Sequence, residues 1–267
     1  MQETICLYDN RNKDAELFAD QLHKIYGIDV FEGQNFIPEN KHCNTMFITL
    51  GGDGFLLQIV HKLKNICDFS KIYPVNYGTI GFLTNSRTQA VGLKAKIESA
   101  VVTRLHFLQI EILLTNGQKV TEFALNDVSV IRQTGQAAHL QISVNHKVRI
   151  ENLVADGIIV ATPAGSTAYN FSVGGPIFNA GSNLLSLQPV APFRPRDWRG
   201  ALIPDDLPIS IESIQTFKRP VSANVDSKHF ADIAKLNISI CKTKGVELCF
   251  NQDFTFADKI LSEQFST

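Results

Sequence analysis

The 267-residue sequence lacks the features that would direct it to a membrane or to nucleic acid. It has no apolar run of 18 residues, so we expect no transmembrane helix, and its first residues lack the basic stretch and apolar core of a signal peptide. The formal net charge is −1, which gives no general attraction to polyanions or anionic lipids. We therefore expect neither nucleic acid nor membrane among its partners.

Cysteine is scarce and scattered. The five cysteines are odd in number, and none forms a Cys-x-x-Cys pair or the Cys/His spacing of a metal site. This pattern favours reduced, mostly structural thiols and a cytoplasmic protein. The residues are Cys6, Cys43, Cys67, Cys241 and Cys249.

Two common catalytic signatures are missing as well. No Gly-x-x-x-x-Gly-Lys-Ser/Thr stretch exists, which excludes a P-loop on pattern. No Gly-x-Ser-x-Gly stretch exists either, so Ser166 is not expected to act as a nucleophile. What the sequence does contain is a set of glycine-rich turns, each placed after an apolar run.

The first hundred residues alternate strand and helix signals. Strands are predicted at residues 4–8, 46–50 and 72–75, and helical spacing of apolar residues appears over residues 14–26 and 55–63. Such alternation predicts a parallel sheet with helices on its faces, in which ligands bind beyond the carboxyl ends of the strands.

Helices become scarce after residue 100, and residues 189–208 are proline-rich and loop-like. Strands are predicted at 105–114, 120–132, 140–148, 157–161, 221–225 and 236–242, and a last helix at 256–265. The fold class is therefore α+β with two domains. We expect an α/β domain (1–100), a larger β-rich domain (101–250), and a C-terminal helix (251–267) that packs back on the first.

The turn Gly51-Gly52-Asp53-Gly54 lies between a predicted strand and a predicted helix. Its glycines let phosphate approach the main-chain amides, and the helix N-terminus adds partial positive charge. A carboxylate at such an anion site suggests that Asp53 binds Mg²⁺ or takes a proton. The alternative is a plain N-cap at Asp53.

A second turn, Asn76-x-Gly78-x-x-Gly-Phe82, follows the strand at 72–75. Asn76 could bind the edge of a purine or ribose, and Phe82 could stack on a base or pack in the core. Further along, Asn126 and Asp127 interrupt a β run. One of them would face inward and bind a ligand amine, unless the pair marks a bulge or strand end.

The run 161–176 carries no charged side chain. Thr162, Ser166 and Thr167 within it offer hydroxyl groups, and one tyrosine can both stack and hydrogen-bond. Asp156 lies just before it, at a predicted strand start. The residues of interest are Thr162, Ser166, Thr167 and Tyr169.

Taken together, these motifs resemble those of the NAD kinase family. The matching stretches are Gly51-Gly-Asp-Gly54, Asn76-x-Gly-x-x-Gly-Phe82, Asn126-Asp127, and Asp156-Gly-x-x-x-x-Thr-Pro-x-Gly-Ser-Thr-Ala-Tyr169 leading to Gly174-Gly-Pro176, in family order and spacing. The resemblance implies transfer of a phosphoryl group from ATP or polyphosphate to the 2′-hydroxyl of the adenosine ribose of NAD, which gives NADP. A divalent cation, Mg²⁺, would accompany the donor.

The resemblance also implies residue roles. Asp53 would be the general base, or would orient the hydroxyl beside Mg²⁺. The donor phosphates would bind at Gly51, Gly52, Gly54, Asn76 and Gly78. NAD would bind at Asn126, Asp127, Thr162, Ser166, Thr167, Tyr169 and Phe82, with Asp156 at the nicotinamide end. Family members are homo-oligomers, so a dimer or tetramer is expected, with a neighbouring subunit completing the nicotinamide end.

The chain departs from the family pattern at four positions. Asp127 stands where glutamate is common, Ala164 replaces a threonine, Ser227 replaces a glycine, and Phe55 replaces a threonine after the first glycine turn. None of these changes removes the candidate base. The alternatives are a lipid or sugar kinase with the same glycine turn, or a module that senses NAD(P) without turnover.

Overall fold

The computed structural model describes residues 3–265 and divides into two compact units. Unit 1 contains residues 1–106 together with 243–267, and unit 2 contains residues 107–242. Two long strands, β5 (Val101–Leu114) and β16 (Ile233–Phe250), contribute residues to both units. The sequence placed its divisions at residues 100 and 250. Because β16 crosses a unit boundary as one strand, the chain returns to unit 1 before that strand ends.

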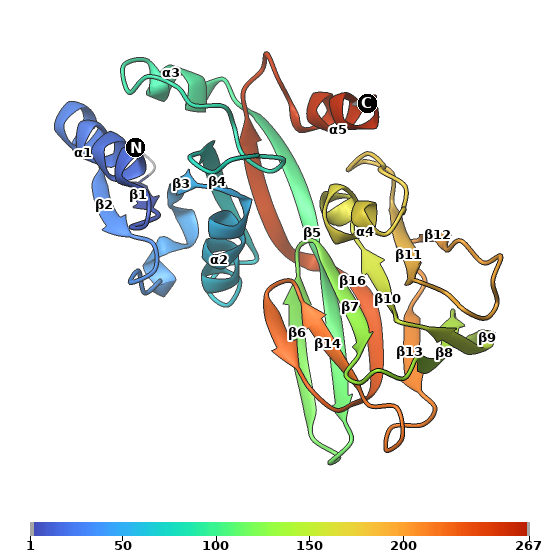
Figure 1. The fold of residues 1–267 in the computed structure, drawn as a ribbon. Coiled ribbons are helices and arrows are strands. Elements are labelled where there is room, and N and C mark those ends of the chain that lie inside the picture. The colour runs from blue at the N-terminus through green and yellow to red at the C-terminus, as the bar shows by residue number, and fades with distance from the viewer. Residues whose placement is uncertain (1–2, 266–267) are drawn as a thin grey trace. The chain divides into compact units, whose positions relative to one another are not determined.

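Unit 1 is built on a parallel sheet, as the alternating pattern predicted (Figure 1). Its strand order is β2-β1-β3-β4-β16, and each neighbouring pair is parallel. The strands are β1 (Thr4–Tyr8), β2 (Asp29–Glu32), β3 (Met46–Gly51) and β4 (Phe69–Asn76), followed by the last residues of β16. Helix α1 (Lys13–Tyr26) follows β1, α2 (Asp53–Leu63) follows β3, and the short 3-10 helix η1 (Asn40–Asn44) precedes β3.

Helix α1 shows how local sequence sets an element's limits. The Asn12 side chain accepts hydrogen bonds from the amides of Asp14 and Ala15, and Gly27 ends the helix in the left-handed conformation at φ +65°. Phe18 and Leu22 on one face are buried against the sheet. The Asn12 cap therefore sets the start of the helix at Lys13, a short turn after β1 ends at Tyr8.

The C-terminal helix α5 (Phe256–Gln264) belongs to unit 1, as does the short helix α3 (Leu93–Glu98). Thr255 and Asp258 form a reciprocal capping box at the start of α5. The Phe256 ring stacks on Phe250 at 5.5 Å between centroids. These contacts hold the helix against the end of β16, within unit 1.

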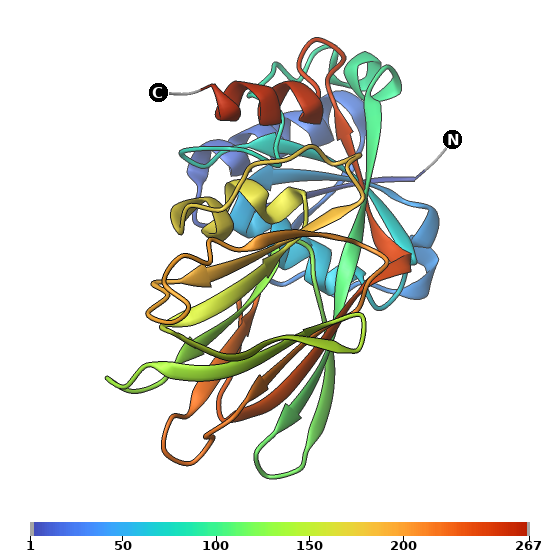
Figure 2. The same cartoon turned by 90° about the vertical axis from the view of Figure 1, so that its right-hand side faces the viewer.

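Unit 2 is a sandwich of two sheets around one core, which can be followed in Figure 2. One layer joins β16 to β13 (Ile209–Ser213), β8 (Ala138–Val144) and β9 (Lys147–Ala155), and β5 pairs with both β16 and β6 (Lys119–Ala124). The other layer has the order β12-β11-β10-β7-β14-β15. Its strands are β7 (Asp127–Arg132), β10 (Gly157–Ala161), β11 (Leu184–Val190), β12 (Ala201–Pro204), β14 (Val221–Val225) and β15 (Lys228–Phe230).

The core of unit 2 draws buried aliphatic side chains from both layers, for example Ile110 and Leu140 from one and Val130 and Val160 from the other. The six strands of the second layer pair in antiparallel fashion. After β10 the chain forms a 3-10 turn, η2 (Ala164–Thr167), and a single helical turn, α4 (Tyr169–Ser172). This irregular segment carries the uncharged run singled out in the sequence.

The predicted fold class is confirmed, and three predicted strands need correction. The run 120–132 is two strands, because the chain turns at Leu125 and Asn126. The run 140–148 is broken where Asn145 and His146 adopt positive φ values. The run 236–242 is part of the much longer β16. The helix at 256–265 is confirmed to within a residue.

No helix among residues 3–265 is long and apolar enough to cross a membrane. The five cysteines are free thiols, and all but Cys43 are buried. Burial raises the pKa of the Cys67 thiol to about 12, which makes it a poor nucleophile.

Candidate functional site

The Asp53 carboxylate is held by the loop that follows β4. Asp53 is the first residue of α2, and Gly52 occupies the N-cap position without a side-chain bond. The amide of Phe82 donates to Oδ2 at 2.8 Å and that of Leu83 to Oδ1 at 3.1 Å, with the Thr84 hydroxyl at 3.4 Å. The N-cap alternative for Asp53 is therefore wrong, because its carboxylate binds a different loop.

Asn85 holds the ends of that loop together. The Asn76 amide donates to the Asn85 carbonyl at 2.8 Å, and the Asn85 amide donates to the Pro74 carbonyl at 2.8 Å. The buried Asn85 side chain donates to the carbonyls of Pro74 and Cys249 and accepts from the Asn251 amide, each at 2.9 Å. Residues 77–84 thus form a loop whose two ends are held together by Asn85.

The glycines of the two turns serve close packing. A Cβ added at Gly78 would lie 2.9 Å from Gly52 Cα, and one added at Gly52 would lie 3.3 Å from Gly78 Cα, so the two backbones pack closely. A Cβ at Gly51 would meet the Phe55 ring at 2.4 Å, which also shows that Phe55 fills the core instead of facing a ligand. A Cβ at Gly54 would meet nothing within 4 Å. Of the predicted phosphate-binding glycines, Gly54 therefore faces open space.

Electrostatics bias Asp53 toward accepting a proton. Burial raises the pKa of its carboxyl above the usual value, and the Phe82 and Leu83 amides and the charge of Lys259 partly oppose that change. Because a general base works best with a pKa near the operating pH, this bias favours proton transfer. The amides of Phe82 and Leu83 and the Thr84 hydroxyl form a cradle, named here the Asp53 cradle, that orients the carboxylate.

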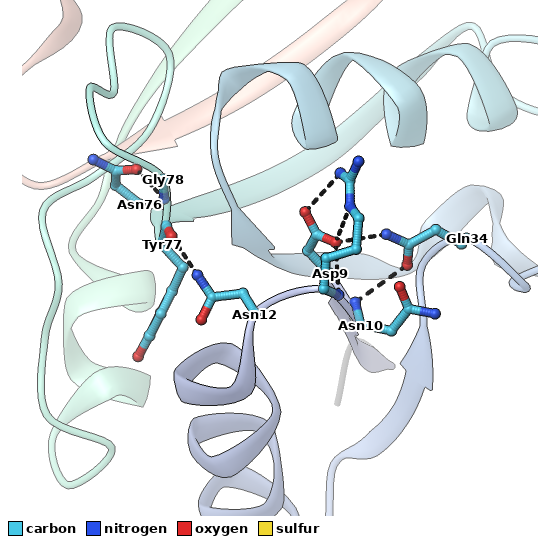
Figure 3. Close-up of polar contacts among 8 residues, drawn as sticks. Asp9, Asn10, Asn12, Gln34, Asn76, Tyr77 and Gly78 are labelled. Atoms are coloured by element: carbon cyan, nitrogen blue, oxygen red, sulfur yellow. Dashed lines mark hydrogen bonds and ion pairs between the residues drawn. The ribbon is translucent and has the colours of Figure 1, made fainter.

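Figure 3 shows the turn after β1 beside the turn after β4. Asn12 donates from Nδ2 to the Tyr77 carbonyl at 2.5 Å, and Asn76 Oδ1 accepts from the Gly78 amide at 2.8 Å. The Asn76 side-chain oxygen therefore shapes its own turn. The sequence prediction of a purine or ribose contact at Asn76 can involve only its remaining amide group.

A second polar cluster in Figure 3 was not anticipated from the sequence. The Asp9 carboxylate, at the end of β1, accepts two hydrogen bonds from the Arg11 guanidinium at 2.9 and 2.8 Å and one from Gln34 at 2.7 Å. The bonds from Arg11 hold the pKa of Asp9 below its usual value. The charged residues at this strand end are thus already paired with each other.

In unit 2, the turn at Asn126 is organised by Asp226. The Asp226 carboxylate accepts hydrogen bonds from three successive amides, those of Leu125, Asn126 and Asp127, at 2.8, 2.9 and 3.2 Å. Asp226 itself has φ +48°, a left-handed conformation that aspartate tolerates. The turn that contains the substituted Ser227 therefore has a structural role through its aspartate.

This arrangement leaves a polar atom of Asn126 unpaired and buries the carboxyl of Asp127. The Asn126 Oδ1 is buried and has no hydrogen-bond partner among residues 3–265. Asp127 is buried at the start of β7, and burial together with the charge of Asp226 raises the pKa of its carboxyl to about 7. Buried polar atoms without partners are costly, so this pair has the character of a binding site.

Thr162 links the turn at Asn126 to the segment that follows β10. Its hydroxyl donates to the Leu125 carbonyl at 2.6 Å and accepts from the Gly165 amide at 3.2 Å. A Cβ at Gly165 would come within 2.1 Å of the Asn126 carbonyl oxygen. The Thr162 hydroxyl is therefore committed to the fold, and the glycine allows the two turns to touch.

The remaining hydroxyls differ in exposure. Ser166 is fully buried and donates to the Pro163 carbonyl at 2.7 Å, whereas Thr167 is 9% exposed. Tyr169, at the start of α4, is 40% exposed, so its ring is open to a ligand. Asp156 lies away from the turn, where its carboxylate accepts from Arg132 Nε at 2.6 Å.

The sequence reasoning missed Asn170 and Asp226 as organising residues. The buried Asn170 side chain donates to the Ser166 and Pro176 carbonyls and accepts from the Ser186 hydroxyl. Its amide packs against Gly175, where a Cβ would lie 2.2 Å from Asn170 Oδ1. For Asn170, the available signal was an amide side chain inside a run of small, hydroxyl-bearing and glycine residues.

Metal binding by side chains is limited. No cluster of three or more His, Cys, Asp or Glu residues occurs in the described part of the chain. Asp53 is a single carboxylate whose two oxygens already accept amides. This donor set fits a Mg²⁺ ion that is carried mainly by substrate phosphates, because Mg²⁺ commonly uses only one or two protein carboxylates.

Comparison with known proteins gives one consistent family. A family profile described as ATP-NAD kinase C-terminal domain matches residues 125–245. The chain is 39% identical to an NAD kinase of Rickettsia rickettsii (strain Sheila Smith), over 98% of this chain and 97% of that protein. It is 37% identical to an NAD kinase of Rhizobium meliloti (strain 1021), over 95% and 94%.

Two solved structures share the fold. Yeast NADH kinase, complexed with NADH, matches with a TM-score of 0.81 and 20% identity over 99% of this chain and 89% of that chain. An NAD kinase from Archaeoglobus fulgidus, in complex with ATP, matches with a TM-score of 0.77 and 23% identity over 97% and 99%.

The raised pKa of Asp127 predicts a pH-dependent stability. A carboxyl whose pKa is higher in the folded than in the unfolded state contributes stability below about pH 4, and this contribution is lost as the pH rises through about 7. Asp127→Asn cannot ionise, so relative to the wild type it should gain stability between pH 5 and pH 8, by at most about 3 kcal/mol. Urea unfolding without ligand at both pH values measures this difference.

The matched control is Asp206→Asn, which alters an exposed aspartate of unit 2. It should change the unfolding free energy equally at both pH values. An equal effect of pH on wild type and Asp127→Asn would contradict the assignment.

Proposed function

The chain belongs to the NAD kinase family, and on that premise we propose how its residues transfer a phosphoryl group from ATP or polyphosphate to the 2′-hydroxyl of the adenosine ribose of NAD. The observation that carries the proposal is the Asp53 cradle. A partly buried carboxylate with a raised pKa is fixed by two amides at the start of a helix that follows a glycine turn. Relatedness over nearly the whole chain argues against the lipid or sugar kinase alternative.

Asp53 acts as the general base in this proposal. As the 2′-hydroxyl oxygen forms its bond to the terminal phosphorus, the hydroxyl proton passes to an Asp53 carboxylate oxygen, and the bond to the leaving phosphate oxygen breaks. The Phe82 and Leu83 amides keep the carboxylate from rotating away. Positioned proton transfer of this kind is typically worth about 10²–10⁴ in rate.

The donor phosphates are assigned to the glycine turns at Gly51, Gly52, Gly54, Asn76 and Gly78. Gly54 supports this assignment because it borders open space at the N-terminus of α2, where helix dipole and amides favour anions. Mg²⁺ bound to the donor would neutralise phosphate charge, and the Asp53 carboxylate would face it.

Unit 2 is proposed to bind NAD. Asn126 Oδ1 lacks a hydrogen-bond donor among the described residues, and the Asp127 carboxyl is buried beside the charge of Asp226, so an adenine amino group and a ribose hydroxyl would give both of them partners. Tyr169 offers an exposed ring for stacking. Thr162 and Ser166 act indirectly, because their hydroxyls hold the turn. Thr167, Phe82 and Asp156 stay predicted contacts, with Asp156 at the nicotinamide end.

The first test is turnover. Purified protein with NAD, Mg²⁺ and either ATP or polyphosphate should form NADP, and Asp53→Asn should lower kcat at least about 10²-fold with little change in NAD affinity. Asp20→Asn, on the exposed face of α1, is the matched control and should retain full activity. A near-normal kcat in Asp53→Asn would place the base elsewhere. Binding of NAD without product from either donor would favour the sensing module.

The second test is NAD affinity measured by calorimetry. Asn126→Ala should weaken binding by roughly 1–3 kcal/mol, because a ligand donor loses its partner. Tyr169→Ala should weaken it by about 0.5–1.5 kcal/mol through lost stacking. Asn237→Ala, an exposed asparagine on β16, serves as the control. Wild-type affinity in both variants would move the NAD site away from this turn.

We further propose a homo-oligomer, a dimer or tetramer. Unit 2 exposes large apolar side chains, among them Phe171 at 48% and Phe193 at 54%, which a neighbouring subunit could cover. Light scattering should report a mass above that of the 29.6 kDa chain, and activity should fall on dilution. A fully active monomer would exclude a shared nicotinamide end. A cytoplasmic location stays a prediction of the cysteine pattern.

A further inference from the structure

Two cysteines of unit 1 meet near the C-terminal end of α2. Cys43 belongs to the 3-10 helix η1, and Cys67 lies between α2 and β4. The Cys43 thiol donates a hydrogen bond to the Ile66 carbonyl oxygen at 2.5 Å, so its sulfur lies against the peptide bond that joins Ile66 to Cys67. Helix η1 also contacts β4, which begins two residues after Cys67.

The two thiols also contact each other. The Cys67 side chain forms hydrogen bonds with those of Cys43 and Ser70. Because a carbonyl oxygen lies about 2.8 Å from the next Cα across a trans peptide, the Cys43 sulfur is at most about 5.3 Å from the Cys67 Cα. A disulfide typically joins Cα atoms about 4.4–6.8 Å apart, so a small shift of η1 brings the pair into bonding geometry. Short 3-10 helices have weaker hydrogen-bond geometry, which allows such a shift.

The two thiols differ in their access to solvent. Cys43 is exposed, whereas Cys67 is buried, as are the other three cysteines of the chain. Burial, together with the contact to Cys43, raises the pKa of Cys67 to about 12. A dissolved oxidant therefore reaches Cys43 first, with Cys67 as its internal partner. An accessible sulfur beside a second, resolving cysteine is the common arrangement of redox-sensitive sites.

We propose that Cys43 and Cys67 are a modification site at which a peroxide forms an intramolecular disulfide. The Cys43 sulfur attacks one peroxide oxygen, the O–O bond breaks, and the thiol proton leaves with the other oxygen as water, which gives a sulfenic acid. The Cys67 sulfur then attacks the Cys43 sulfur, and the sulfenic hydroxyl leaves with the Cys67 proton as a second water. Two thiols thus lose two electrons and two protons, and one hydrogen peroxide becomes two waters.

The buried position of Cys67 suits the second step. Its raised pKa makes it slow toward dissolved reagents, so it is protected from separate oxidation. Once the Cys43 sulfur is a sulfenic acid, however, the reaction is intramolecular, and well-oriented intramolecular reactions have effective molarities that reach about 10⁵–10⁸ M. Proximity therefore offsets the low thiolate content of Cys67.

The disulfide encloses the part of the chain that presents Asp53. Residues 43–67 contain β3, the turn Gly51–Gly54 and all of α2. A cross-link around a loop of this length stabilises a protein mainly by constraining the unfolded chain. Because α2 has 11 residues that each rise about 1.5 Å, the cross-link lies about 16 Å along the helix from Asp53. It therefore stabilises this segment without contacting the Asp53 cradle.

The experiment treats the full-length protein with hydrogen peroxide, blocks the remaining thiols with N-ethylmaleimide and maps tryptic peptides by mass spectrometry. Trypsin places the two cysteines on different peptides, because it cuts after Lys62 and Lys64. We expect a linked pair containing Cys43 and Cys67, two hydrogen masses lighter than the reduced peptides and released by dithiothreitol. Cys43→Ala changes an exposed side chain and should abolish the pair, whereas the control Cys241→Ala should keep it.

Thermal unfolding supplies a second readout. Peroxide-treated wild type should unfold at a temperature roughly 5 °C above that of the reduced protein, because of the closed loop. Cys43→Ala should show no such rise, and dithiothreitol should reverse it in the wild type. An unchanged midpoint in wild type that carries the disulfide would overturn the stabilising role.

The peptide map decides the chemistry. Oxidation of Cys43 to sulfinic or sulfonic acid without a linked pair, or a bond between the Cys43 residues of two molecules, would overturn the proposed site. Persistence of a Cys67-containing linked pair in folded Cys43→Ala would overturn it as well. Neither readout uses turnover, so a failure to form NADP would count against the proposed function and leave this inference standing.

Discussion

A carboxylate taken out of water must be given hydrogen bonds, and the Asp53 carboxylate receives them from main-chain amides that its own helix does not supply. That requirement explains the closed loop after β4, the buried Asn85 at its base, and the glycines that let residues 52 and 78 meet. Because the donors belong to backbone, they are fixed before any ligand arrives. Catalysis by a preorganised site demands this rigidity.

In unit 2 a carboxylate is again held by main-chain amides, but there it serves to fix the shape of a turn. There a carboxylate, Asp226, serves the backbone by accepting three amides, and so shapes the turn of Asn126 and Asp127. These three bonds stabilise the main chain of the turn, while Asn126 Oδ1 is buried without a partner in the described chain and the Asp127 carboxyl has a raised pKa. The free energy gained from well-paired groups thus offsets the cost of a small number of poorly paired ones, as is usual in a binding site.

The structure also changes the meaning of several sequence motifs. The hydroxyls of Thr162 and Ser166 read as ligand contacts, yet both are committed to carbonyl oxygens of neighbouring turns. Gly51 was predicted to bind phosphate, yet a side chain there would strike the Phe55 ring. A motif can therefore be typical of a function because some of its residues shape the main chain of the site and do not themselves bind the ligand.

The sequence by itself determined the elements whose signals are local. Apolar spacing predicted the parallel α/β part and the last helix, and the order of the glycine motifs indicated the family. It did not reveal that β16 continues through the polar residues around Gly245, where a side chain would collide with the Leu105 carbonyl. Only the tertiary structure decided which polar atoms are satisfied, because the partners lie far apart along the chain: Asp226 is 99–101 positions from its amides, and Lys259 is 178 from Gly81. Hydrogen bonds and charge interactions depend on distance in space, whereas sequence patterns report only on residues that are close along the chain.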